Sequence, residues 1–254
     1  MASKQLASLA QSTLHRVRNG DSEMYLCGSL LPSHARASFF ATRSLNLELA
    51  GVRDAVRGNV AMGRVRMAFW RDFIGAACSG ASATAQASPG AQLSSHPLFE
   101  PLRGCIAAHG HSRRSLERLV DARDADLEGR PPASVGEVSA YAEATHSTLL
   151  YLTLEALGVR DAAADHAASH VGKAAGIATL LRSLPVHTRL GQQYLPLDLL
   201  AKVRGSACES AAPWRRSYPS IALTPAHCPP PHPTPRTTHT HTTWAPFAAR
   251  AEHL

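Results

Sequence analysis

The segment SHARASFFATRSLNLELAGVRDAV, residues 33–56, indicates the fold class of this chain. Its apolar side chains recur every three or four residues, a spacing that places them on one face of an α-helix. Thr42 is the only polar member of that face, which runs through Ala35, Phe39, Thr42, Leu45, Leu49, Val52 and Val56. Ser33 follows Pro32 and is the expected N-cap. The segment therefore predicts a long helix with one buried side.

Other segments predict helices of the same kind. Their ranges are 60–77, with Val65, Phe69 and Phe73 on one face beside Met67 and Trp70; 112–128, with Leu116, Leu119, Val120 and Leu127; 134–157; and 160–184. Ser134 and Glu137 form a capping-box pattern, and Pro185 should end the last helix. No alternating strand pattern competes. We therefore expect an all-α fold with about seven helices before residue 203.

Composition narrows the class of protein further. The chain has 254 residues, 44% of them hydrophobic, and its mean hydropathy of −0.13 excludes a polytopic membrane protein. Lys and Arg number 26 against 19 Asp and Glu, a modest excess that is spread along the chain, so we expect no nucleic-acid partner. Five cysteines without paired spacing indicate neither a disulfide framework nor a zinc site.

Three regions are expected along the chain. Residues 1–13 belong to a segment with basic residues and no acid before Asp21, which is typical of a mitochondrial targeting segment or of an ordinary polar N-terminus. Residues 14–203 should form the helical domain. Residues 204–254 contain the run CPPPHPTPRTTHTHTTW, whose Pro, His and Thr content predicts a disordered tail.

Short strings, taken in order, resemble the squalene/phytoene synthase family. They are Leu31-Pro32 with Arg36, Phe40 to Arg43, Arg66 to Trp70, Asp126-Leu127 with Tyr141, Leu180 to Arg182, and Tyr194 to Pro196. The resemblance implies the helical bundle of the isoprenoid synthases. It is strongest to one branch, the mitochondrial complex I assembly factor 6 group, through strings such as YLCGSLLP (25–32) and DHAASHVGKAAGIATLLRS (165–183).

The resemblance stops near residue 203, which implies a bundle truncated at its C-terminal end. Family members continue past this point with further helices, and here the Pro-rich run takes their place. We hypothesise that residues 204–254 derive from a retained intron or a frameshift in the gene. Sequencing the transcript across codon 203 would test this hypothesis.

The resemblance also implies a specific chemistry. Enzymes of the family condense two prenyl diphosphates with Mg²⁺ ions, which aspartates on two helices hold. The positions matching those aspartates are Asn46, Leu47, Ala50, Thr179, Ser183 and His187, and none carries a carboxylate. Because Mg²⁺ prefers carboxylate oxygens, we expect a degenerate pocket with no metal and no catalytic residue. Other family positions are retained, at Arg36, Arg43, Arg66, Trp70, Arg182 and Tyr194.

Two functions follow from this resemblance. The first is a non-catalytic, cofactor-free assembly factor for respiratory complex I, on the matrix side of the mitochondrial inner membrane. Its partners would be complex I subunits or other assembly factors, with peripheral contact to the membrane. The alternative is a prenyltransferase of the phytoene or squalene synthase type that uses Mg²⁺. Chelator-sensitive turnover of a prenyl diphosphate would distinguish the two.

Two patterns in residues 165–183 can be interpreted without the family. His166 and His170 have the spacing of a zinc-binding pair on one helix face, but no third ligand lies near them in sequence, and an interfacial or core pair is the alternative. The stretch from Gly172 to Gly176 lacks the preceding strand of a phosphate loop. It predicts close helix packing instead, together with Ala174 and Ala175.

Overall fold

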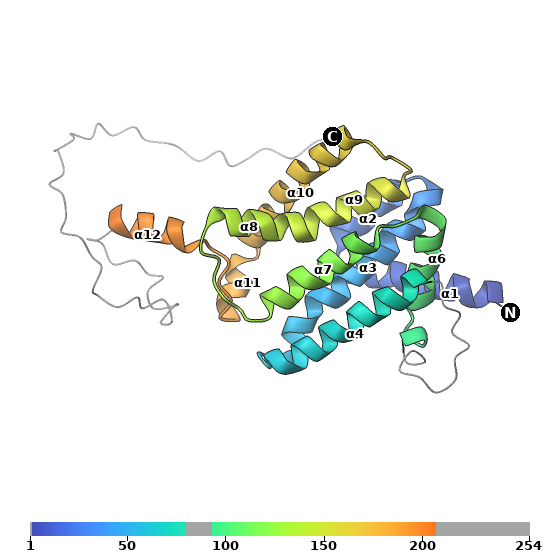
Figure 1. The fold of residues 1–254 in the computed structure, drawn as a ribbon, viewed down its shortest axis with the longest axis horizontal. Helices are drawn as coiled ribbons and strands as arrows, with labels where there is room; N and C mark the ends of the chain where they lie inside the picture. The colour runs from blue at the N-terminus through green and yellow to red at the C-terminus, as the bar shows by residue number, and fades with distance from the viewer. Residues whose placement is uncertain (1, 80–92, 207–254) are drawn as a thin grey trace, which may run out of the picture. The chain divides into compact units, whose positions relative to one another are not determined.

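The computed structural model describes residues 2–79 and 93–206 of the chain. The chain divides into two compact units, Met1–Tyr218 and Pro219–Leu254, and every described residue belongs to the first. Within the described residues there is no β-strand, which confirms the predicted all-α class (Figure 1). Nearly all of the predicted tail, from residue 207, lies outside the described residues, as do residues 80–92.

The described residues contain more helices than the seven we expected. They are α1 (Ala2–Gly20), α2 (Ser22–Leu30), α3 (Ser33–Val56), α4 (Val60–Ser79), α6 (Phe99–His109), α7 (Arg113–Asp126), α8 (Val135–Ala142), the π-helical turn η1 (Glu143–Ser147), α9 (Thr148–Ala156), α10 (Ala162–Arg182), α11 (Leu184–Arg189) and α12 (Leu197–Ser206). The count rises because the predicted helix 134–157 divides and because short helices such as α11 lie next to the predicted ones. Pro185, for example, lies beyond the end of α10 but inside the first turn of α11, where proline is tolerated.

Helix α3 has the predicted bounds and the predicted buried face. All seven residues of that face are buried, and the helix packs against α1, α4, α6, α7 and α9. The predicted N-cap is wrong, because Pro32 holds that position and Ser33 is already helical. Arg57, in the left-handed conformation at φ 46°, ends the helix. Figure 1 shows α3 running alongside α4 and α7.

The main core lies between α3, α4, α6, α7 and α9. From α7 it includes Leu116, Leu119 and Val120, as predicted. The predicted face of α4 is wrong at Val65, which is 66% exposed, because the helix turns Met67 and Trp70 inward with Phe73. Burying these larger side chains removes more apolar surface from water than burying a valine would. A smaller cluster joins α1 to α3 through Val17, Phe39 and Phe40.

The predicted helix 134–157 contains a π-helical turn. Ser134 caps α8 by accepting the Glu137 N–H at 3.3 Å, while the Glu137 carboxylate accepts the N–H of Ala133 at 2.7 Å instead of that of Ser134. Helix α10 packs on η1 through two glycines. A Cβ at Gly172 would lie 2.4 Å from Ser147 Cα, and one at Gly176 would lie 2.7 Å from a methyl group of α8. The packing prediction is confirmed for these glycines and is wrong for Ala174 and Ala175, which are exposed.

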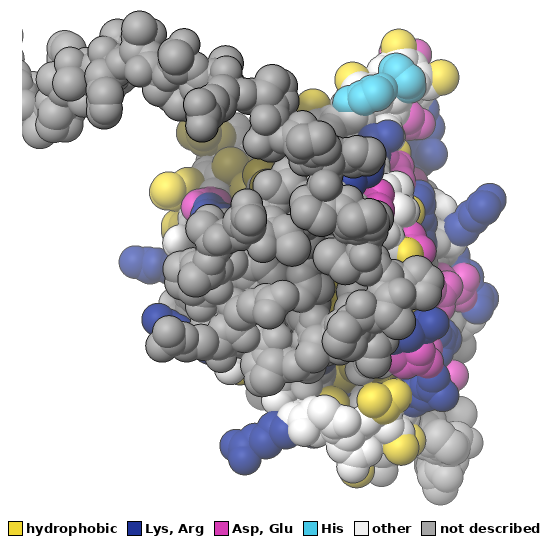
Figure 2. All heavy atoms as spheres, turned by 90° about the vertical axis from the view of Figure 1, so that its left-hand side faces the viewer, with side chains coloured by type: hydrophobic (Ala, Val, Ile, Leu, Met, Phe, Trp, Pro, Cys, Tyr) yellow, Lys and Arg dark blue, Asp and Glu magenta, His cyan; other side chains and the backbone are white. Residues whose placement is uncertain are grey.

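Ion pairs hold α4 to α7 on the outside of the domain. Arg71 contacts the carboxylates of Asp121 at 3.0 Å and Asp124 at 2.7 Å, and Arg64 contacts Glu128 at 2.7 Å. In Figure 2, basic and acidic side chains alternate along one edge of the face shown. Among the helices described, none has the length and apolar character needed to cross a membrane.

Candidate functional site

The six positions predicted to form a degenerate metal site do not all meet. On α3, Asn46 faces α7 and its Oδ1 accepts a hydrogen bond from Arg123 Nη2 at 3.4 Å. Leu47 lies on another side of α3, against α1, where its methyl groups approach Gly20. Ala50, half-buried one turn further along, offers no polar atom from its side chain.

The other three positions lie at the end of α10 and in α11. The Thr179 hydroxyl donates to the carbonyl of Ala175 at 2.8 Å, inside its own helix. Ser183 joins α10 to α11 and donates its backbone N–H to the Thr179 carbonyl at 3.0 Å. The imidazole of His187 packs against the Tyr194 ring, with the ring centroids 4.6 Å apart.

Tyr194 links this end of the domain to α3 and α7. Its hydroxyl donates to Asp126 Oδ2 at 2.7 Å and accepts from Arg53 Nη1 at 2.6 Å, while Arg53 also contacts Asp126 Oδ1 at 3.0 Å. Burial, followed by the Asp126 charge, raises the pKa of Tyr194 and keeps its hydroxyl protonated. The three side chains therefore form a closed network in which the Asp126 carboxylate is already neutralised.

Two more arginines lie on the same two helices, Arg43 on α3 and Arg123 on α7. Arg43 is 8% exposed, and its guanidinium stacks on the Phe39 ring at 5.2 Å. Arg123 donates to the Tyr141 hydroxyl at 2.7 Å. Among the described residues, the Nε atoms of both arginines are buried without a hydrogen-bond partner. Burial lowers the pKa of Arg43, and burial followed by the charges of Arg123 and Arg43 lowers the pKa of His146 to about 4. This part of the domain interior is therefore strongly cationic.

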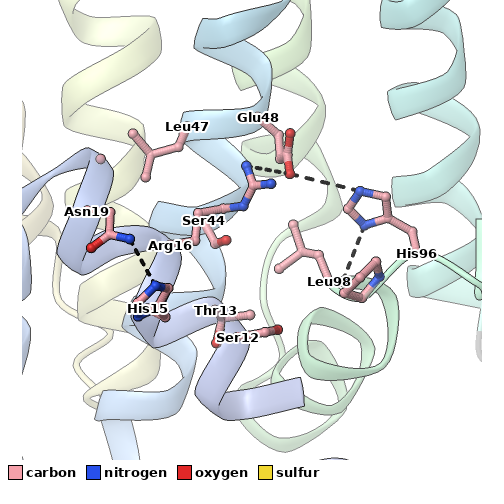
Figure 3. A pocket seen from close by; sticks show the side chains of 12 residues that line it. Ser12, Thr13, His15, Arg16, Asn19, Ser44, Leu47, Glu48, His96 and Leu98 are labelled. Atoms are coloured by element: carbon pink, nitrogen blue, oxygen red, sulfur yellow. Dashed lines mark hydrogen bonds and ion pairs between the residues drawn. The ribbon is translucent and has the colours of Figure 1, made fainter. Parts of the chain in front are cut away.

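A separate pocket of about 670 Å³ lies between α1, α3 and residues 96–98. Figure 3 shows Arg16 reaching Glu48, with His96 beyond the carboxylate. Arg16 Nη1 is 2.7 Å from Glu48 Oε1, and His96 Nε2 is 3.9 Å from the same atom. Burial lowers the pKa of His96. Leu47 lines this pocket, whereas Asn46 contacts Arg123 of α7.

Comparison with known proteins places the chain in a family. The family model described as squalene/phytoene synthase matches residues 17–220. The chain belongs to the squalene/phytoene synthase family. The match continues past residue 203, where we expected the resemblance to stop, into residues that the structure does not describe. The boundaries predicted for the N-terminal segment and the tail stay predictions.

Within the squalene/phytoene synthase family, the chain is similar to proteins named NADH dehydrogenase (ubiquinone) complex I, assembly factor 6. The protein of Rattus norvegicus is 41% identical over 187 residues, which cover 73% of this chain and 52% of the relative. That of Homo sapiens is 40% identical over 187 residues, with the same coverage. The Dictyostelium discoideum homolog is 30% identical over 190 residues, 74% of this chain and 50% of the relative. The chain thus spans about half the length of these curated relatives.

The residues at the matching positions do not suit the Mg²⁺ ions of this family's enzymes. A Mg²⁺ site needs carboxylate and other hard oxygen ligands in octahedral geometry. The six positions supply no carboxylate, and the amide oxygen of Asn46 already accepts a hydrogen bond from Arg123. Asp126, the carboxylate of the adjacent network, is bound by Arg53 and Tyr194. The guanidinium charges would in addition repel a divalent cation.

The retained family positions are spread over the domain. Arg43 lies in the cationic region described above, and Tyr194 lies in the network with Arg53 and Asp126. Arg36 instead donates to the Leu31 carbonyl at 2.8 Å, Arg66 is exposed on α4, and Arg182 pairs with Glu23 at 2.6 Å. Trp70 packs in the core with its ring 5.0 Å from that of Phe73. The structure therefore does not gather the six retained positions into one site.

Sequence reasoning missed one buried polar network. Ser38 Oγ is 2.5 Å from His111 Nε2, and His111 Nδ1 is 2.9 Å from Glu155 Oε2. This is the order of groups in a serine hydrolase triad, but Ser38 has no exposed surface, so no substrate can reach it. The network instead joins α3, the α6–α7 turn and α9. No local motif indicates it, because its members lie 73 and 44 residues apart.

Proposed function

We propose that this chain is a non-catalytic assembly factor for mitochondrial respiratory complex I. The curated relatives that it matches, from mammals to Dictyostelium discoideum, are named as assembly factors of complex I. One structural observation favours this role over prenyl transfer. At the positions matching the Mg²⁺ ligands of the family's enzymes, this chain has no carboxylate, and the Asp126 carboxylate is bound by Arg53 and Tyr194.

The proposal includes location and partners. The chain would act on the matrix side of the inner membrane, without a cofactor and without nucleic acid. Its partners would be complex I subunits or other assembly factors. Peripheral membrane contact is supported by an exposed basic edge of α7, formed by Arg114 and Arg118 with Arg113, which also pairs with Glu117 at 2.7 Å. Anionic headgroups attract such an edge, and no helix has to enter the bilayer.

A deletion strain of the source organism tests the proposal. Complex I level, by native gel electrophoresis, and the content of squalene and carotenoids are measured in the same cultures. We expect complex I to fall and the isoprenoid products to stay at the parental level. The intact gene should restore complex I. Gly51→Ala, at an exposed site where a Cβ meets nothing within 4 Å, is the matched control variant and should restore it as well.

A second arm uses the purified protein. It is incubated with farnesyl or geranylgeranyl diphosphate and Mg²⁺, and diphosphate release is followed with and without a chelator. We expect release at the level of the protein-free control. Chelator-sensitive turnover, or a deletion strain that loses isoprenoid products while complex I stays normal, would overturn the proposal in favour of a prenyltransferase.

A further inference from the structure

Helix α10 presents two histidines to solvent on one side. His166 and His170 are both exposed, and their rings lie 4.6 Å apart at an interplanar angle of 78°. The two Nε2 atoms are 3.2 Å from each other. An acidic residue, Asp165, is exposed in the same turn of the helix. The pair is therefore neither in the core nor covered by another described element.

The distance between the two nitrogens is close to the separation that one metal ion imposes. Zn–N bonds of about 2.0–2.1 Å and a tetrahedral angle place two ligand nitrogens about 3.3 Å apart, and a right angle places them about 2.9 Å apart. The 3.2 Å observed lies between these values. The separation of the two nitrogens therefore already suits a cation bound to both rings.

The surroundings favour an accessible and rigid pair. Ala163, Ala167 and Ala174, which flank the histidines along α10, are exposed and too small to cover them. The helix is fixed at both ends of this stretch. The Asp161 side chain caps its N-terminus, and Gly172 holds the next turn against η1. A pre-organised pair loses less conformational entropy on binding than a mobile one.

We propose that His166 and His170 form a two-histidine site for a divalent transition-metal cation of the zinc, copper and nickel class. Imidazole nitrogen is a preferred ligand for these ions and not for Mg²⁺. Within residues 2–79 and 93–206, no group of three or more His, Cys, Asp or Glu side chains is placed to hold a metal. The remaining coordination positions therefore belong to water and are open to ligands from a partner. This site is independent of the proposed role in complex I assembly.

The test is calorimetric titration of the full chain with Zn²⁺ or Ni²⁺ alone. A titration with Mg²⁺ is the negative control. The decisive variant, His170→Ala/Val171→His, keeps the number of histidines but moves one of them about 100° around the helix. Val171 is 60% exposed, so the fold should tolerate this change. We expect the wild type to bind one Zn²⁺ per chain at this site. This variant and His166→Ala should lose that binding or bind Zn²⁺ at least tenfold more weakly.

The tail requires its own control, since it also contains histidines. His239→Ala/His241→Ala removes two of them at sites outside the described residues, and it should leave the α10 site unchanged. Thermal unfolding gives a second measurement, because a cation bound by both histidines stabilises the folded state. The melting temperature should rise with Zn²⁺ in the wild type and in the tail variant only. Equal Zn²⁺ affinity and equal stabilisation in the displaced-histidine variant would refute the site.

Discussion

The contact between α10 and η1 leads to a sharp prediction for Gly172→Ala. Gly172 is buried, and an added Cβ would lie 2.4 Å from Ser147 Cα, 2.4 Å from its Oγ and 2.6 Å from its backbone nitrogen. The Oγ could rotate away, but the two backbone atoms belong to the π-helical turn. The side chain of Ser147 is also engaged, because it donates to the Ser169 carbonyl at 3.0 Å.

The magnitude follows from this geometry. Carbon atoms pack best about 3.5–4.0 Å apart, so the helices must separate by about 1 Å to admit the methyl group. Overpacking of this kind costs about 1–3 kcal/mol, and the backbone contact places Gly172→Ala at the upper end. Alanine recovers about 0.5–1 kcal/mol through its higher helix propensity. We therefore expect a net loss of about 2 kcal/mol in the free energy of unfolding.

Gly51→Ala on α3 is the matched control. Gly51 lies inside an α-helix as Gly172 does, but it is exposed and a Cβ there meets nothing within 4 Å. This variant should gain about 0.5–1 kcal/mol. Urea unfolding followed by circular dichroism at 222 nm measures both variants against the wild type. If Gly172→Ala proves as stable as Gly51→Ala, the close packing of α10 on η1 is refuted.

Three further predictions concern buried polar groups. Ser38→Ala leaves His111 Nε2 buried and unpaired, so it should cost about 1–3 kcal/mol in urea unfolding, and no loss would contradict the network. Burial lowers the pKa of His146 to about 4, so this side chain binds fewer protons in the folded state than in the unfolded state, and stability should fall as the pH drops from about 6.5 to about 4. His146→Gln should remove up to about 3 kcal/mol of that pH dependence, measured by urea unfolding at pH 4.5 and 7.5. An unchanged pH dependence in this variant would count against the assignment to His146. Tyr194→Phe keeps the ring but loses the hydrogen bond to Asp126, and a drop of about 1–2 kcal/mol in urea unfolding should follow.

The parts of the fold that the sequence predicted well are those with strong helical periodicity. On α3 the spacing identified the bounds and the whole buried face, because seven side chains repeat with one period. On α4 several large apolar residues lie on more than one side, so the period alone did not choose between Val65 and Met67. The π-helical turn adds one residue locally, and no residue pattern in 134–157 indicates where.

The candidate site was less predictable because its contacts are distant in sequence. Arg53 meets Tyr194, which lies 141 residues away, and Asp126, which lies 73 residues away. The family resemblance indicated which positions lacked carboxylates, but only packing determines that Leu47 faces α1 while Asn46 faces Arg123 of α7. Periodicity gives the angle of a residue around its helix, whereas the neighbour at that angle depends on the whole topology.

Asn46→Asp tests directly whether the cationic region can still hold a metal. The substitution returns a carboxylate to a position where the family's enzymes have one. In this chain, however, Arg123 Nη2 lies 3.4 Å from Asn46 Oδ1, so the new carboxylate would meet a guanidinium first. A charge-assisted hydrogen bond is worth about 1 kcal/mol more than a neutral one. We expect Asn46→Asp to raise the free energy of unfolding by about that amount.

The same variant should show no dependence on Mg²⁺. One carboxylate that is already paired with Arg123 cannot supply the several anionic oxygens that Mg²⁺ requires, and Ala50, one turn along, supplies none. Thermal unfolding of Asn46→Asp in millimolar Mg²⁺ and in chelator should therefore give the same melting temperature. A clear rise with Mg²⁺ in this variant alone would show that the arginines leave room for a cation, and that the site lacks only a ligand.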